Sequence, residues 1–163
     1  HFFELAGKRF RPTLVLLAST AASGGGEANP RQRRLAELTE MIHAASLLHD
    51  DVADVADTRR GARAAHRIYG NKVAVLAGDF LLARASVLLA RQGDVRAVEL
   101  VALAIEEMVH GELMRARAAS HELLDFDHYL SKTYRKTAAL MSLSCRASAL
   151  LGDQPPPIEQ VSK

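Results

Sequence analysis

The sequence LLHDDVADVADTRRG, residues 47–61, places three carboxylates at the end of an apolar helical pattern. They are Asp50, Asp51 and Asp54, at spacing i, i+1 and i+4, and a doubly basic turn follows them. Acidic side chains near a helix C-terminus oppose the helix dipole, and like charges four residues apart repel each other. The cluster is therefore unfavourable unless a cation binds there, and a hard divalent cation is the expected ligand.

The acidic cluster ends a helix that we expect to begin at Asn29-Pro30, because Asn is a common N-cap and Pro fits the first helical turn. Helical spacing places His43 on one face with Asp50 and Asp54, so a histidine and two carboxylates face the same space. Apolar residues recur on a stripe of this helix, at Leu35, Leu38, Ile42, Ala45 and Leu48.

Mg²⁺ is the divalent cation that this helix face suits. It takes oxygen ligands and is typically held by one or two carboxylates together with substrate phosphates. We therefore predict that Asp50 and Asp54 hold Mg²⁺. A solvated acidic helix end is the alternative, but the apolar Leu47, Leu48 and Val52 around the carboxylates make a generic acidic surface a poorer description.

Two basic clusters are candidates for phosphate binding. The stretch GKRFRP, residues 7–12, places Lys8 and Arg11 three residues apart at a helix start, where free backbone N–H groups favour anions. Arg59 and Arg60 form the second cluster, because guanidinium groups match phosphate oxygens in bidentate fashion. Either cluster alone could be solvated surface. Together with the acidic cluster, they are what a Mg²⁺-dependent diphosphate site requires.

A third basic cluster, KTYRKTA, covers residues 132–138. Lys132 and Lys136 share a face of the last expected helix, where Lys136 and Thr137 could offer a charge and a hydroxyl to a phosphate. The alternative is a lysine-rich solvated face.

The remaining sequence predicts further helices joined by short connections, and so an all-α fold. No segment shows sustained strand alternation. The helix 72–89, with Asn71 as its expected cap, is apolar nearly all round apart from Asp79 and Arg84, and we expect it to be buried centrally. The other expected elements are helices over 10–22, 95–119 and from Asp125 or Asp127 to Leu151, a loop over 57–64 and a short helical piece over 66–69.

Composition narrows the class of protein. The 163 residues are 48% hydrophobic, enough for one domain with a sizeable core, and the net charge of +2 gives no electrostatic argument for a nucleic-acid partner. The single cysteine, Cys145, excludes an intrachain disulfide and is expected to be a small buried helix residue. Arg84 interrupts the longest apolar run, so we expect no transmembrane segment and a soluble protein.

These motifs together resemble the trans-type isoprenyl diphosphate synthases, also called polyprenyl synthetases. The first aspartate-rich motif of that family, Asp-Asp-x-x-Asp followed by Arg-Arg-Gly, stands at residues 50–54 and 59–61. Gly-Lys-Arg-x-Arg-Pro stands at residues 7–12, and EMIHAASL, AGD and KTA match at residues 40–47, 77–79 and 136–138. The resemblance covers residue 1 to about Gly152. It implies a helical bundle around a central cavity, incomplete at the C-terminus, with residues 1–163 as the N-terminal part of one domain.

The resemblance also implies a reaction and a set of site residues. Members condense isopentenyl diphosphate with an allylic prenyl diphosphate by ionisation, condensation and elimination, with Mg²⁺ stabilising the departing pyrophosphate. By this resemblance, isopentenyl diphosphate would be bound by Lys8, Arg11, His43 and Arg60. The allylic diphosphate would meet the Mg²⁺ on Asp50 and Asp54, with Asp51 close by, and would contact Arg59, Lys136 and Thr137.

Product length in this family is set by the side chains one and two turns before the first aspartate. Ala45 and Ser46 are both small here, and Ile42 lies two turns before the aspartates. An aromatic plug of the short-chain type is absent from these positions. We therefore predict a long-chain polyprenyl product, of the kind that supplies quinone side chains, and expect Ala45→Phe to shorten it.

Two departures from the family pattern stand out. Nothing after Gly152 supplies the second aspartate-rich motif of the family, so we expect that the chain alone cannot complete the metal cluster. The family commonly has Gly-Glu-x-x-Gln in its fourth long helix, whereas Gly111-Glu112-Leu113-Met114-Arg115 places arginine at the glutamine position.

A synthase-like subunit that binds prenyl diphosphates or regulates a catalytic partner is the main alternative to an enzyme. Such partners often lose the first aspartate motif, which is present here, so the sequence favours catalysis. The resemblance further implies a homodimer or heteromer, with helices 72–89 and 95–119 as candidate interface, and a bacterial cytoplasmic, mitochondrial or plastid location.

Overall fold

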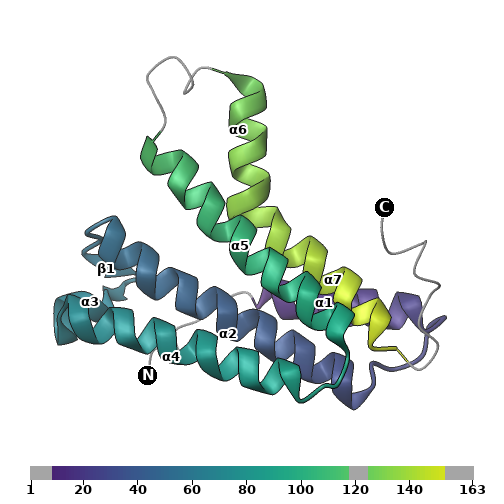
Figure 1. Ribbon diagram of the computed structural model, residues 1–163. Coiled ribbons are helices and arrows are strands. Elements are labelled where there is room, and N and C mark those ends of the chain that lie inside the picture. Colours follow the sequence, from purple (N-terminus) through teal and green to yellow (C-terminus); the bar gives the residue numbers. More distant parts are fainter. Residues whose placement is uncertain (1–8, 118–124, 153–163) are drawn as a thin grey trace.

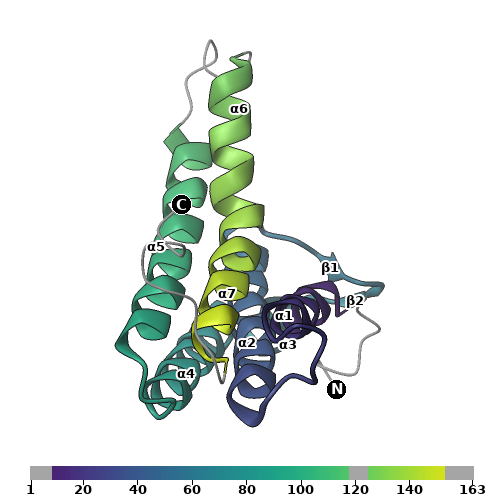
Figure 2. The same cartoon turned by 90° about the vertical axis from the view of Figure 1, so that its right-hand side faces the viewer.

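The computed structural model describes residues 9–117 and 125–152, and within these ranges the chain is almost entirely helical (Figures 1 and 2). The all-α prediction is confirmed. The elements in chain order are α1 (Phe10–Ala22), α2 (Pro30–Ala53), β1 (Thr58–Arg59), β2 (Ala62–Arg63), α3 (Ala65–Tyr69), α4 (Asn71–Ala90), α5 (Val95–Arg117), α6 (Phe126–Thr133), the π-helical segment η3 (Tyr134–Ala138) and α7 (Ala139–Leu150).

Helix α2 is the central element, because α1, α4 and α7 all pack against it. It begins as predicted. The Asn29 side chain accepts a hydrogen bond from the Gln32 N–H at 3.0 Å, and the Gln32 side chain accepts one from the Asn29 N–H at 2.9 Å. This capping box satisfies two backbone donors that the first helical turn leaves unpaired. The helix ends at Ala53 with Asp54 as its C-cap, so the acidic cluster occupies its last turn.

The hydrophobic core lies among α1, α2, α5 and α7. Its largest fully buried side chains come from the first half of α2 and from α7 with its C-cap, and they include Leu35, Leu38, Leu140 and Leu151. Cys145 packs against this core and is only partly buried; burial raises the pKa of its thiol. The acidic end of α2 therefore extends beyond the core.

Helix α4 runs beside α2 (Figure 1), but the prediction that it is buried centrally is wrong for this chain. Its buried residues form a stripe of mostly small side chains, and the rest of the helix is largely exposed. Phe80, for example, is 68% exposed. A helix that is apolar on every side carries no signal of which face is packed, which is why the sequence misled here. Asn71 is also not the cap, since Gly70 occupies that position.

Length and composition alone would allow α4 to cross a membrane, since its mean hydropathy reaches 1.9 over an 18-residue window. Core helices of soluble proteins meet the same criterion, so this single helix is weak evidence for a membrane-spanning segment.

Helix α5 packs mainly on α7 and η3. Asp94 caps its start, because the Asp94 side chain accepts from the Ala97 N–H at 3.3 Å. The predicted last helix is confirmed as α6, η3 and α7 in direct succession, and Asp125 caps it by accepting from the Asp127 N–H at 3.0 Å. The π-helical turn in its middle was not predicted.

The expected loop over 57–64 contains a small hairpin. Thr58 pairs with Arg63 and Arg59 pairs with Ala62 in antiparallel register. Arg60 and Gly61 form its turn with φ of 52° and 79°, the positive values that a tight two-residue hairpin turn requires. Two residues per strand are too few to leave an alternating pattern, so the sequence did not indicate this hairpin.

Candidate active site

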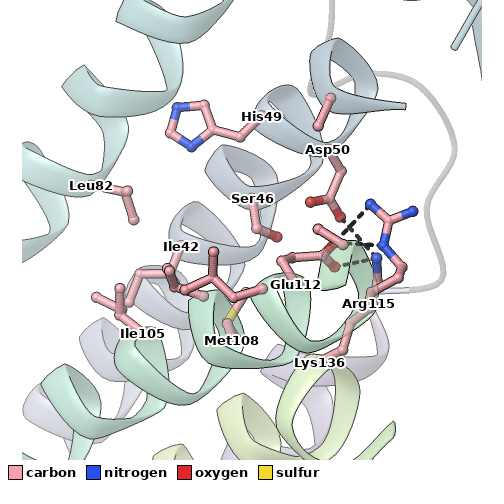
Figure 3. Close-up of a pocket in the computed structure, with 14 residues that line it drawn as sticks. Ile42, Ser46, His49, Asp50, Leu82, Ile105, Met108, Glu112, Arg115 and Lys136 are labelled. Atoms are coloured by element: carbon pink, nitrogen blue, oxygen red, sulfur yellow. Dashed lines mark hydrogen bonds and ion pairs between the residues drawn. The ribbon is translucent and has the colours of Figure 1, made fainter. Parts of the chain in front are cut away.

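A cavity of about 340 Å³ lies between α2, α4 and α5, with η3 at one end (Figure 3). Its inner end is apolar, lined by Ile42, Leu82, Ile105 and Met108. Its outer end is lined by charged side chains, which we call the charged mouth: Asp50, Glu112, Arg115 and Lys136. The cavity can therefore accommodate a molecule with an apolar body and a charged head.

Asp50 and Lys136 face each other across the charged mouth. The Lys136 Nζ lies 3.7 Å from the Asp50 carboxylate and also forms an ion pair with Glu112. Burial raises the pKa of Asp50, as do the neighbouring Glu112 and Asp54, while Lys136 and Arg115 oppose that shift. A bound cation would relieve this repulsion among carboxylates.

Arg115 connects the last turn of α2 to α5. Its Nη2 lies 2.7 Å from the Asp54 carboxylate and 2.7 Å from the Glu112 carboxylate. The hydrogen bonds to Asp54 and to Glu112 raise the pKa of Arg115, so the guanidinium is charged under all ordinary conditions. Arginine at the position where the family commonly has glutamine thus contacts an acid of the first aspartate motif.

Asp51 differs from its two acidic neighbours. It is 1% exposed and accepts hydrogen bonds from Arg59, with Nε at 2.9 Å and 3.3 Å from its two carboxylate oxygens. This hydrogen bond raises the pKa of Arg59. The structure therefore places Asp51 and Arg59 in a pair that holds the hairpin against the end of α2.

Arg11, His43 and Arg60 come together near the middle of α2, where His43 lies two turns before Asp50 on the same helix face but outside the cavity lining. Arg11 Nη1 donates to His43 Nε2 at 3.0 Å. The pKa of His43 is lowered to about 4, most of all by burial and then by the charges of Arg11, Arg60 and Arg59 in that order. His43 is therefore a neutral acceptor near pH 7. Lys8, the fourth residue predicted here, lies outside the described residues.

Thr137 follows Lys136 in the π-helical segment and is exposed. Gly111 of α5 explains how this segment approaches the cavity. A Cβ on Gly111 would lie only 2.8 Å from the Lys136 backbone nitrogen, so glycine is needed for η3 to pack this closely. π-Helical turns within α-helices occur often at functional sites.

The residues predicted to set product length divide into two groups. Ser46 and Ile42 line the cavity, whereas Ala45 is fully buried and is not part of the lining. The small Ser46 side chain donates to the His43 carbonyl at 2.9 Å and leaves the space beside it open.

The lining also includes residues that were not assigned from the sequence, among them Leu82, Ile105, Met108 and Glu112. The last three of these lie on α5, where Ile105, Met108, Glu112 and Arg115 follow each other at three- and four-residue spacing. This stripe, apolar first and charged later, is a signal that could have identified the α5 wall of the cavity.

The sequence-predicted donors for a metal are Asp50 and Asp54. In residues 9–117 and 125–152, no three histidine, cysteine or acidic side chains lie close enough to hold a metal ion together. Two carboxylates four residues apart beside a cavity nevertheless fit Mg²⁺, which completes its coordination with water and substrate phosphates.

Comparison with known proteins gives a family model described as polyprenyl synthetase, which matches residues 1–163. Solanesyl-diphosphate synthase 1, mitochondrial, of Oryza sativa subsp. japonica is 47% identical over 167 residues, covering 93% of this chain and 39% of the rice protein. Decaprenyl-diphosphate synthase of Dictyostelium discoideum is 49% identical over 151 residues, covering 93% of this chain and 32% of that protein.

A similar solved structure is a decaprenyl diphosphate synthase from Rhodobacter capsulatus, with a TM-score of 0.88 and 38% identity over 99% of this chain and 48% of that one. Another, a polyprenyl synthase from Caulobacter crescentus complexed with calcium and isoprenyl diphosphate, has a TM-score of 0.86 and 35% identity over 97% of this chain and 47% of that one. The chain thus spans about half the length of these two structures. It spans less than half the length of the two curated relatives.

Proposed function

Because the chain belongs to the polyprenyl synthetase family, we propose that it forms the N-terminal part of a prenyltransferase that makes long-chain trans-polyprenyl diphosphates. Its substrates are isopentenyl diphosphate and an allylic prenyl diphosphate. The observation that supports this most directly is the cavity, whose apolar inner end and charged mouth match a prenyl tail and a diphosphate head. The product has the length of a quinone side chain.

Asp50 and Asp54 hold Mg²⁺ at the charged mouth in this proposal. Mg²⁺, when bound, stabilises the negative charge of the departing diphosphate. Lys136 supplies a cationic contact to the same diphosphate, as does Thr137, its neighbour in sequence, through its hydroxyl. Arg59, whose charge interacts with Asp50 and Asp54, contacts that diphosphate as well. Asp51 acts indirectly, because its pair with Arg59 positions the hairpin that carries both arginines.

Isopentenyl diphosphate binds at Arg11, His43 and Arg60, together with Lys8. The neutral imidazole of His43 accepts from Arg11 and so orients that guanidinium for a phosphate. The allylic tail extends past Ser46 toward Ile42, Leu82, Ile105 and Met108. This apolar lining excludes water from the allylic cation, which would otherwise be captured before the isopentenyl double bond attacks it.

The protein acts as a homodimer or heteromer in this proposal. One face of α4 carries the exposed apolar residues Val73, Leu76, Phe80 and Val87 at helical spacing, and we call it the outer face of α4. A contiguous exposed apolar face of this kind indicates a protein interface.

The test is incorporation of radiolabelled isopentenyl diphosphate by the full-length protein. We expect Asp50→Asn and Asp54→Asn each to lower the rate by about a hundredfold or more, because transition-state charge stabilisation is lost. Asp57→Asn is the matched control, since Asp57 is 83% exposed and pairs with Arg67. Residues 1–163 alone should incorporate nothing.

A non-catalytic subunit is the second candidate, and the occupation of Asp54 by Arg115 is the observation that favours it. Full-length protein that binds a prenyl diphosphate but turns over no isopentenyl diphosphate would establish this alternative.

A further inference from the structure

The guanidinium of Arg115 lies between the carboxylates of Asp54 and Glu112. Its Nη2 contacts Asp54 and Glu112 at the same distance of 2.7 Å, and its Nε donates a second hydrogen bond to Glu112 at 2.8 Å. The guanidinium thus fills part of the space beside Asp54 that a divalent cation would approach.

We propose that Arg115 competes with the divalent cation for Asp54. The guanidinium of Arg115 pairs with the Asp54 carboxylate and must be displaced from it before the metal binds. This inference rests on the proposed function, because it takes Asp54 as a ligand of that metal.

Glu112 provides the position to which Arg115 moves. It already accepts two contacts from the guanidinium, so Arg115 can give up Asp54 and keep its ion pair on α5. Because Arg115 and Glu112 lie three residues apart on one helix, this change needs only a side-chain rotation. The side chains of Arg115 and Asp54 are both 40% exposed, so water can enter as the pair opens.

The formal charge of the charged mouth together with Asp54 determines how strongly Arg115 lowers the affinity for a divalent cation. Asp50, Asp54 and Glu112 bring three negative charges, and Arg115 and Lys136 bring two positive ones, so the five side chains carry a formal net charge of −1. Glutamine in place of Arg115 changes this to −2, equal and opposite to a divalent cation. One unit charge beside a divalent ion corresponds to about a tenfold change in affinity when water screens the interaction.

The experiment measures Mn²⁺ binding to the full-length protein without substrate, from the electron paramagnetic resonance signal of free Mn²⁺. We expect Arg115→Gln to bind Mn²⁺ about tenfold more tightly than the wild type. Arg117→Gln is the matched control, because it removes the same charge from the same exposed end of α5 and should leave Mn²⁺ affinity unchanged. Arg115→Lys keeps the charge and should bind Mn²⁺ within about threefold of the wild type.

A second readout is thermal melting in EDTA and in saturating Mn²⁺. Arg115→Gln should gain more melting temperature from Mn²⁺ than the wild type does, because tighter binding to the folded state stabilises it more. Unchanged or weaker Mn²⁺ binding by Arg115→Gln would overturn the inference. Asp54→Asn separates the two proposals: if Mn²⁺ binding is the same in this variant and the wild type, the metal site itself is wrong and the inference falls with it.

Discussion

At the scale of single residues, neighbouring side chains of one motif have different surroundings. Asp51 is buried against Arg59, whereas Asp54 is 40% exposed and pairs with Arg115. The sequence indicates the positions of the acids but carries no information on which one is buried, because this depends on the hairpin that folds back onto α2. The Arg115–Asp54 pair joins residues far apart in sequence, and no local pattern could predict it.

His43 predicts a pH dependence of stability. Its pKa in the folded protein is about 4, below the ordinary value of 6.5, so the unfolded chain binds the proton first as the pH falls. The stabilisation from neutral His43 is complete above pH 6.5 and is lost progressively toward pH 4. We expect the difference in free energy of unfolding between the wild type and His43→Gln to decrease over this range. Urea denaturation at pH 7, 6 and 5 measures it, and a constant difference would contradict the prediction.

Ser46 predicts control of product length. Because Ser46 lines the cavity, the ring in Ser46→Phe should obstruct the path past Ile42 and shorten the main product. Ala45→Phe should also shorten it, but Ala45 is fully buried, so overpacking should lower stability by about 1–3 kcal/mol as well. Chromatography of dephosphorylated products measures chain length. An unchanged product from Ser46→Phe would exclude this wall of the cavity as a determinant.

At the scale of elements, helix starts and apolar stripes were predictable, and the choice of packed face was not. The caps Asn29, Asp94 and Asp125 act through side chains on their own helix start, so local sequence identifies them. The packed face of α4 depends on the elements around it, and its uniform apolar composition conceals it. The π-helical turn depends on Gly111, which lies on a different helix.

Gly111 predicts a sensitive contact between α5 and η3. A Cβ there would meet the Lys136 backbone, which cannot rotate away, so we expect Gly111→Ala to lower the free energy of unfolding by about 2 kcal/mol and to displace Lys136. Gly78→Ala is the comparison, because the three atoms nearest to its Cβ all belong to the His49 side chain, which can move. We expect Gly78→Ala to change stability by less than about 1 kcal/mol. Denaturant unfolding of both variants measures this; equal losses would contradict the prediction.

At the scale of the whole molecule, the chain separates two regions along α2. The core lies at the start of this helix, and the cavity with its charged mouth lies toward its end. Family resemblance predicted both the helical bundle and the charged site, but the extent of exposed apolar surface on α4 emerged only from the structure.

The outer face of α4 predicts how the protein assembles. Phe80→Glu places a charge in the centre of this face and should shift the full-length protein toward smaller species in size-exclusion chromatography with light scattering. Ser86→Glu is the control, because it adds the same charge on another side of α4 and should leave the mass unchanged. An unaltered mass for Phe80→Glu would show that this face is not the subunit interface.

The hairpin imposes a strict spacing on the chain. Arg59 and Arg60 are consecutive, yet Arg59 binds Asp51 while the charge of Arg60 acts on Arg11 and His43. Arg59 belongs to β1, whereas Arg60 is the first residue of the turn and has a positive φ, so the two side chains leave the hairpin from different backbone conformations. Most surface loops accept insertions at little cost. Here one residue added between Asp51 and Arg59 would move Arg59 out of register with Asp51, so this loop should tolerate changes of composition far better than changes of length.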